Sequence, residues 1–128
     1  MARRWRHDSA GPMTFGMELI LDLGGCAPEG ISDAEAIRGY ARELVKLIEM
    51  KPFGEPIIEH FGHDDPVTSG YTLVQLIETS SIVGHFSEKL GRAYLNIFSC
   101  RRFDSELALR FSADWFGSDE IRQTLIIR

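Results

Sequence analysis

Three strand-like segments follow one another between residues 71 and 99, and the links between them are too short to contain a helix. The segments are Tyr71–Glu78, Ile82–Phe86 and Arg92–Ser99, and Gly91 marks the turn before the last of them. Antiparallel strands can be joined by a tight hairpin, whereas parallel strands need a crossover of about a dozen residues or more. The spacing therefore predicts a largely antiparallel sheet.

Three further segments have the pattern of strands. Met17–Leu23 is an apolar run with two acidic interruptions, and a pair of glycines ends it. Ile57–Phe61 is a shorter candidate, and Ile121–Ile127 alternates apolar and polar residues. We therefore expect six strands, four of which are consecutive in the chain.

Two amphipathic helices interrupt the series of strands. The first begins at Ser32, which would form a capping box with Glu35, and it ends before Pro52. Asp104 can cap the second helix, and Gly117 ends it. Each helix has an apolar face that must be buried, and the sheet offers the nearest apolar surface. The predicted fold class is an α/β (α+β) sandwich, in which a largely antiparallel sheet carries two helices packed on one face.

The other face of the predicted sheet has no helix to cover it. Glu18 and Asp22 interrupt the first strand at alternate positions, so we expect them to line this open face. A second copy of the chain would cover the remaining apolar positions. The pattern therefore predicts a homodimer.

Length and composition fit one domain over residues 1–128, with residues 1–13 as a flexible basic tail. The formal net charge of −5 argues against nucleic acid as the main partner. No apolar run approaches the roughly 20 residues of a membrane helix, so we expect no membrane association. Cys26 and Cys100 are expected to be free thiols in the cytoplasm, and the four histidines lack the spacing of a zinc site.

A run of hydroxyl side chains lies between two of the predicted strands. Thr79, Ser80 and Ser81 are consecutive, and His85 follows. A hydroxyl nucleophile beside an imidazole is the minimal equipment for acyl transfer. Such runs are also typical of turns, so the pattern alone leaves both interpretations open.

Cys100 ends the next strand and also has two interpretations. It is either a small buried residue or a thiol that transfers a proton beside the hydroxyl run. If Ile82–Phe86 pairs with Arg92–Ser99, Cys100 returns close to Ser80 and Ser81.

From Gly16 to its end the chain resembles the short bacterial and archaeal type of S-adenosylmethionine decarboxylase. The segment Gly16–Cys26 is similar to that family's GRHLxxDxYGC, and Phe98-Ser99-Cys100 is similar to the FTC that ends a later strand. The family's central serine, histidine and cysteine are separated by five and then fifteen positions. Ser80, His85 and Cys100 have both intervals.

The resemblance implies a self-processing carboxy-lyase of polyamine (spermidine) biosynthesis. It implies cleavage between Thr79 and Ser80, after which Ser80 becomes a pyruvoyl group that serves as the cofactor without a metal. His85 would remove the α-proton of residue 80, and Cys100 would protonate the substrate carbanion, because a free thiol with a pKa near 8.5 is mostly protonated at neutral pH. Thr72 corresponds by spacing to the family's second processing hydroxyl, with Ser69 as a rival.

The central motif also departs from the family pattern. The family's Glu-Ser cleavage pair is Thr79-Ser80 here, and a rival alignment that uses Glu78 would make Thr79 the nucleophile and lose the histidine. Lys89 occupies the position of the ribose-binding glutamate, so Glu88, one place earlier, is the substrate-binding candidate. Extra residues precede the motif, and Phe61 is the nearest candidate to stack on adenine.

These departures keep three functions open. The first is an S-adenosylmethionine decarboxylase. The second is the same pyruvoyl chemistry on a plain amino acid such as ornithine or arginine, which the loss of the ribose-binding glutamate favours. The third is an unprocessed, non-catalytic family member that binds a ligand or a partner subunit, which the altered cleavage pair favours.

Overall fold

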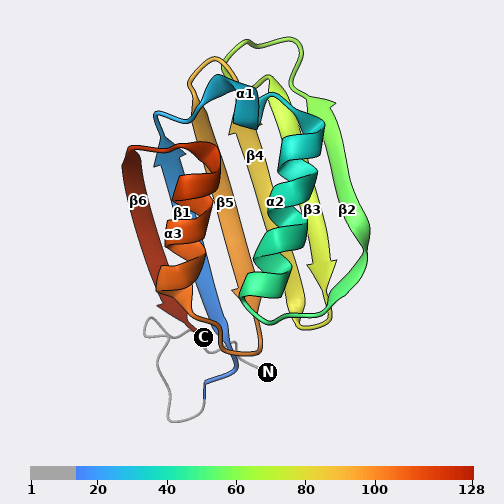
Figure 1. Ribbon diagram of the computed structural model, residues 1–128, viewed down its shortest axis with the longest axis vertical. Helices are drawn as coiled ribbons and strands as arrows, with labels where there is room; N and C mark the ends of the chain where they lie inside the picture. The colour runs from blue at the N-terminus through green and yellow to red at the C-terminus, as the bar shows by residue number, and fades with distance from the viewer. Residues whose placement is uncertain (1–13) are drawn as a thin grey trace, which may run out of the picture.

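One six-stranded antiparallel sheet organises the chain in the computed structural model, which describes residues 14–128 (Figure 1). The strands lie in the order β2-β3-β4-β5-β1-β6, and every pairing is antiparallel. The prediction of hairpins between the middle strands is therefore confirmed. The tail predicted for residues 1–13 lies outside the described residues. The strands are β1 (Met17–Gly24), β2 (Pro52–Phe61), β3 (Gly70–Ile77), β4 (Ser80–Ser87), β5 (Arg92–Ser99) and β6 (Glu120–Ile127).

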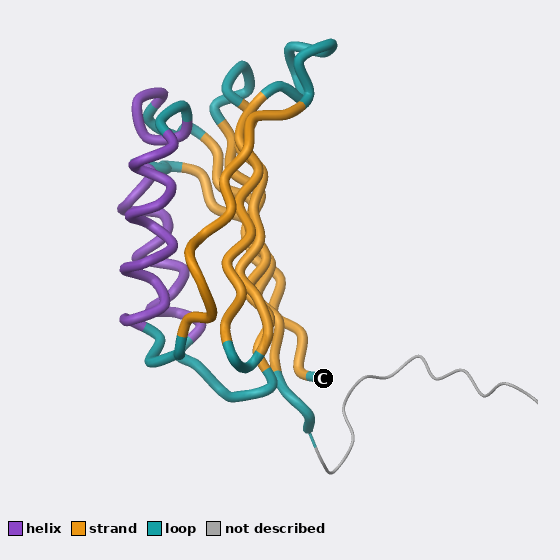
Figure 2. Tube along the Cα trace, turned by 90° about the vertical axis from the view of Figure 1, so that its right-hand side faces the viewer, coloured by secondary structure: helices purple, strands orange, loops and turns teal. Residues whose placement is uncertain are grey.

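The helices lie together on one face of this sheet, as Figure 2 shows. The two predicted helices are α2 (Ala34–Leu47) and α3 (Ser105–Phe116), and they pack side by side over the strands. A third, short helix, α1 (Pro28–Ile31), was not predicted. The predicted fold class is confirmed with this addition. Within residues 14–128, no helix has the length and apolar character that a membrane span requires.

The start of α2 differs from the prediction because α1 lies immediately before it. Ser32 ends α1, where its hydroxyl donates to the carbonyl of Pro28. Asp33 is the residue that caps α2, and its carboxylate accepts the N–H of Glu35 at 3.0 Å. The capping box at Ser32 was therefore wrong by one residue. The caps predicted for α3 are confirmed, since Asp104 accepts the N–H of Leu107.

The edge strand β2 is twice as long as the predicted segment Ile57–Phe61. It begins at Pro52, directly where the first helix was expected to be stopped, and its pairing shifts between Phe53 and Ile57. Prolines are tolerated in edge strands, because one side of an edge strand pairs with nothing. The turn residues in this stretch therefore mark an irregular edge rather than the absence of a strand.

Side chains alternate between a helix-covered face and an open face. Leu19, Leu21 and Leu23 of β1 are fully buried under the helices, whereas Glu18 and Asp22 point to the other face. The same alternation runs through β3, β4 and β5, because successive side chains leave a strand on opposite sides, whereas the edge strand β6 is exposed from Glu120 to Leu125. The prediction that Glu18 and Asp22 line the open face is confirmed.

Candidate functional site

The turn between β3 and β4 places the predicted cleavage pair at one end of the sheet. Ile77 pairs with Ser80, and Ser80 pairs with Ser99 on β5. This register brings Cys100 beside the turn, where its backbone N–H donates to the carbonyl oxygen of Thr79 at 3.1 Å. A donor directed at a carbonyl oxygen can stabilise the negative charge that develops there on nucleophilic attack. We call this group, Thr79, Ser80, Ser99 and Cys100, the turn end.

Ser99 is a member of the turn end that the sequence reasoning missed. It is fully buried, and its hydroxyl donates to the hydroxyl of Thr79 at 2.8 Å. The same oxygen accepts the backbone N–H of Arg101 at 3.0 Å. The bond to Thr79 holds the residue before the predicted scissile peptide bond against the core. The sequence signal that could have identified Ser99 is its position, since it is a serine at an inward-facing strand position directly before a candidate cysteine.

A second group of polar side chains lies towards the opposite end of β4. Thr72 of β3 pairs with His85, and Thr72 Oγ1 is 2.9 Å from His85 Nδ1. The other ring nitrogen, Nε2, is 2.7 Å from the backbone carbonyl oxygen of Thr68. Thr72 therefore lies beside His85, and its role as the second processing hydroxyl stays a prediction. The rival Ser69 reaches this strand through its backbone carbonyl, which accepts the N–H of Glu88.

Six polar side chains form a row across the open face, one from each strand, and His85 is a member. Each member is the register partner of the next. A shallow hollow of about 310 Å³ follows the row and is floored in part by Val83 and Asn96. The row consists of Glu59, Thr72, His85, Tyr94, Asp22 and Arg122.

Ser80 and His85 are not brought together within one chain. They are five positions apart on one strand, which corresponds to about 16 Å at the usual rise per residue. Their odd separation also places them on opposite sides of the strand, since Ile82 and Phe86 are buried under the helices. Proton transfer between Ser80 and the ring of His85 would therefore need an imidazole from outside the same chain.

The two predicted substrate-binding residues lie at the His85 side of the sheet. Phe61 ends β2 opposite Gly70 and is 55% exposed. Glu88 follows β4, and its Oε2 is 2.6 Å from Nε2 of His60. His60 lies within β2, inside the segment Ile57–Phe61 that was predicted as a strand, and its Nδ1 is buried without a hydrogen-bond partner among residues 14–128. The carboxylate of Glu88 is therefore already engaged.

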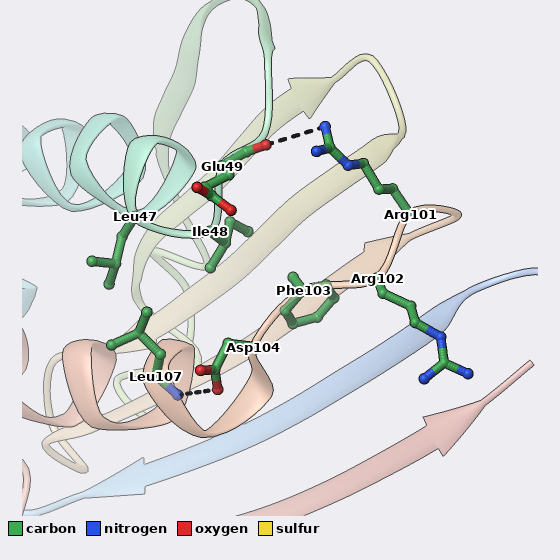
Figure 3. Close-up of a pocket in the computed structure, with 8 residues that line it drawn as sticks. All are labelled: Leu47, Ile48, Glu49, Arg101, Arg102, Phe103, Asp104 and Leu107. Carbon is green, nitrogen blue, oxygen red and sulfur yellow. Dashed lines mark hydrogen bonds between the residues drawn. The ribbon is translucent and has the colours of Figure 1, made fainter.

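A larger hollow lies on the helix side, just after Cys100 in the chain (Figure 3). It has a volume of about 450 Å³, and two of its charged side chains have structural partners. Arg101 donates to the carbonyl of Glu49, and Asp104 caps α3. None of the predicted site residues lines it. We therefore place the candidate site on the strands rather than in this hollow.

The two cysteines have different surroundings. Cys26 is buried at the end of β1, and burial raises the pKa of its thiol, although the backbone hydrogen bond with Ala93 and the charge of Arg92 partly oppose this. Cys100 is exposed at the turn end. Both are free thiols, as predicted. Within residues 14–128, no three His, Cys, Asp or Glu side chains come close enough together to hold a metal ion.

Comparison with known proteins identifies the family. The model of the S-adenosylmethionine decarboxylase family matches residues 17–128, which include every strand and helix described above. The chain belongs to the S-adenosylmethionine decarboxylase family. The resemblance that was predicted from the spacing of Ser80, His85 and Cys100 is thereby confirmed at the level of the family.

A solved member of this family has the same fold. The crystal structure of the adenosylmethionine decarboxylase from Aquifex aeolicus VF5 superposes with a TM-score of 0.75 and 22% sequence identity, covering 90% of this chain and 91% of that one. Among curated proteins, no sequence matches this chain. Family and fold imply a decarboxylase, and the activity of this divergent chain depends on its own residues.

Proposed function

We propose that this chain is a pyruvoyl-dependent S-adenosylmethionine decarboxylase of spermidine biosynthesis in the cytoplasm, and that it cleaves itself between Thr79 and Ser80. The observation that carries the proposal is the 3.1 Å hydrogen bond from the N–H of Cys100 to the carbonyl of Thr79. It lies at the one peptide bond where the family spacing requires activation. A hydrogen bond at this carbonyl favours attack by the following hydroxyl.

The cleavage chemistry can be written with the residues of the chain. The hydroxyl oxygen of Ser80 adds to the carbonyl carbon of Thr79, the C–N bond breaks, and an ester replaces the amide. A base then removes the α-proton of residue 80, and elimination releases Thr79 with a free carboxylate. Hydrolysis of the resulting dehydroalanine liberates ammonia and leaves a pyruvoyl group at residue 80. Thr79 supplies only its backbone carbonyl, so the missing family glutamate is not required.

The residues of the turn end fit this group. Residue 80 follows a tight turn that Ser99 and the N–H of Cys100 hold in place, and the exposed thiol of Cys100 is the adjacent proton donor. A pyruvoyl carbonyl supplies an electron sink for the loss of carbon dioxide from an α-amino acid. Cys100 would return a proton to the α-carbon, and the hydrogen-bonded backbone around Thr79 would keep this end of the sheet in place.

A second copy of the chain supplies what one chain lacks. The base for residue 80 would be His85 of a partner, since His85 of the same chain is about 16 Å away along β4. The open face is suited to such contact because large apolar side chains remain uncovered there. Phe53 is 65% exposed, Ile57 56% and Leu76 45%. Face-to-face packing of two sheets would bury them and bring polar rows of both chains together, and residue 80 would have to turn its α-proton towards the open face to meet the partner's imidazole.

The substrate class rests on the contacts of Glu88. An acceptor for ribose hydroxyls is needed to bind a nucleoside, and Lys89 has donors only. Glu88 is bound to His60 at 2.6 Å and must exchange this partner to bind ribose. This pairing favours, as a second candidate, the same reaction on ornithine or arginine. S-adenosylmethionine remains the first candidate because the family model matches nearly the whole described chain.

Intact mass tests the proposal. Denatured protein is expected to separate into fragments 1–79 and 80–128, with the second fragment blocked at its N terminus. Release of carbon dioxide from carboxyl-labelled S-adenosylmethionine, ornithine and arginine then identifies the substrate. A single intact mass under all conditions contradicts self-cleavage and leaves the third alternative, a non-catalytic binding subunit.

A further inference from the structure

Residues 62–69 form a strap that lies against the end of β4. The strap connects β2 to β3 and contains the extra residues that precede the central motif. Three consecutive backbone carbonyls of the strap accept hydrogen bonds from the end of β4 and the residue after it. The bonds are Ser87 Oγ to Val67 O at 2.6 Å, His85 Nε2 to Thr68 O at 2.7 Å, and Glu88 N to Ser69 O at 3.3 Å.

The contact with Thr68 determines where His85 carries its proton. A backbone carbonyl can only accept a hydrogen bond, so Nε2 must be the protonated nitrogen. In the neutral ring, Nδ1 then has the lone pair, and the hydroxyl of Thr72 must be the donor in the 2.9 Å contact with Nδ1. Both ring nitrogens are thus assigned by their partners, and the ring cannot rotate without losing two hydrogen bonds.

We propose that the strap is a positioning element that locks His85 in the Nε2–H tautomer and turns its basic Nδ1 towards Thr72. This goes beyond the proposed function but rests on it for the role of His85 as the base. Thr68 acts through its carbonyl, so it positions His85 without touching reacting atoms. The titratable side chains that share the open face around the ring are Glu59, Tyr94 and Asp22.

Two features of the strap hold the Thr68 carbonyl in place. Asp65 organises the turn, because its carboxylate accepts the N–H of Val67 at 2.9 Å and its carbonyl accepts the N–H of Thr68 at 3.1 Å. Gly62 has a φ of 77°, and a β-carbon there would lie 2.4 Å from the Thr68 oxygen. A side chain at residue 62 therefore has to displace the carbonyl that binds His85.

The glycine at position 54 offers a matched control. Gly54 has a similar φ of 73°, but a β-carbon there would meet no atom of residues 14–128 within 4 Å. Gly62→Ala and Gly54→Ala therefore introduce the same backbone strain, and only the first displaces the Thr68 carbonyl. Both are made in the full chain with Ser80→Ala, so that the measurement does not depend on cleavage.

Nitrogen-15 NMR of the imidazole rings reads the tautomer directly. The expected result is that His85 is in the Nε2–H form in the Ser80→Ala chain and in the Gly54→Ala variant. Gly62→Ala is expected to lower the preference for this form by about two- to tenfold, the equivalent of one net hydrogen bond. An Nδ1–H ring in the Ser80→Ala chain, or equal effects of the two alanines, overturns the proposal.

A second pair of variants keeps the test valid if Gly62→Ala does not fold. Asp65→Ala removes the carboxylate that caps the strap, and Asp64→Ala removes the neighbouring exposed carboxylate. Asp65→Ala should lower the tautomer preference of His85, Asp65→Asn should restore it, and Asp64→Ala should leave it unchanged. An unchanged tautomer preference of His85 in Asp65→Ala contradicts the proposal. A failure of the proposed function would appear only in the intact mass.

Discussion

The two ends of β4 hold their functional groups in different ways. At the turn end, Thr79 and Cys100 are joined through the backbone, and the fully buried Ser99 holds the turn through its hydrogen bond to the hydroxyl of Thr79. At the other end, Thr72 and His85 are joined through side chains on the open face, and the strap supplies the third partner. In the proposed mechanism, one end activates a peptide bond and the other holds a base.

This difference shows why neither end is a complete site. The turn end has a hydroxyl, a polarised carbonyl and a thiol but no imidazole. The strap end has an imidazole with an aligned hydroxyl but no scissile bond. They are about 16 Å apart in one chain, and the open face between them carries exposed apolar side chains. In the proposed mechanism, the two ends that act together therefore come from two copies of the chain.

The largest expected effect comes from Ser80 at the turn end. Ser80→Ala removes the attacking oxygen, so release of fragments 1–79 and 80–128 should stop completely. Ser81→Ala changes the next residue, which pairs with Phe98, and should still permit cleavage. Intact mass after denaturation compares the two variants. Cleavage in Ser80→Ala, or its loss only in Ser81→Ala, would show that the alignment is shifted by one residue.

Cys100 separates the two reactions that the turn end is proposed to support. Cys100→Ala keeps the backbone N–H that binds the Thr79 carbonyl, so cleavage should proceed. The loss of the thiol should lower decarboxylation by about 10²–10⁴-fold, the usual contribution of a general acid. Cys26→Ala, at the buried thiol, is the matched control and should leave turnover near that of the unaltered chain. Equal turnover in the two variants would remove Cys100 from the mechanism.

A charge introduced on the open face should weaken the association of two chains. It should thereby keep the turn end of one chain away from His85 of the other. Val83 is half-buried on the floor of the polar row. Val83→Asp would place an unpaired charge in the proposed interface, which costs roughly 3 kcal/mol and weakens association about 100-fold. Leu107→Asp, on the exposed surface of α3, is the control. Sedimentation at several concentrations measures the effect, and unchanged association of Val83→Asp would contradict the proposed interface.

The smallest effect distinguishes the two thiols. Burial raises the pKa of the Cys26 thiol above its ordinary value. The folded chain holds this proton more tightly than the unfolded chain. The contribution of Cys26 to the free energy of unfolding is therefore fully present below the ordinary pKa of a thiol, and it is lost as the pH rises through the higher pKa of the folded chain. A thiol reagent at pH 8 should therefore label Cys100 well before Cys26. Faster labelling of Cys26 in the folded chain would contradict its burial.

Much of the fold could be predicted because its signals are local. Alternation in β1, the tight links between the middle strands and the cap at Asp104 each depend on a few neighbouring residues. The start of α2 was misplaced by one residue because two adjacent residues, Ser32 and Asp33, are both good caps. β2 was shortened because its prolines and glycine are turn residues in most contexts, and only its position at the sheet edge permits them.

The candidate site was predictable in part for a similar reason. Ser80 and His85 lie on one strand and Cys100 follows the strand that pairs with it, so the intervals between the three residues reflect a hairpin that is local in sequence. The support from Ser99 and from the strap was missed because much of it is made with backbone groups, which leave no mark on residue type. The pairing of His60 with Glu88 was missed because it joins residues 28 positions apart.

Complementation between two inactive chains tests the central claim most directly. His85→Ala alone should release fragments about 10²–10⁴-fold more slowly, and Ser80→Ala alone should release none. A tag on the Ser80→Ala chain allows mixed dimers to be purified after co-expression. The account predicts that the His85→Ala chain is cleaved in these mixed dimers, because its partner supplies the imidazole. Mixed dimers in which the His85→Ala chain stays intact would contradict the assignment of the two ends to two chains.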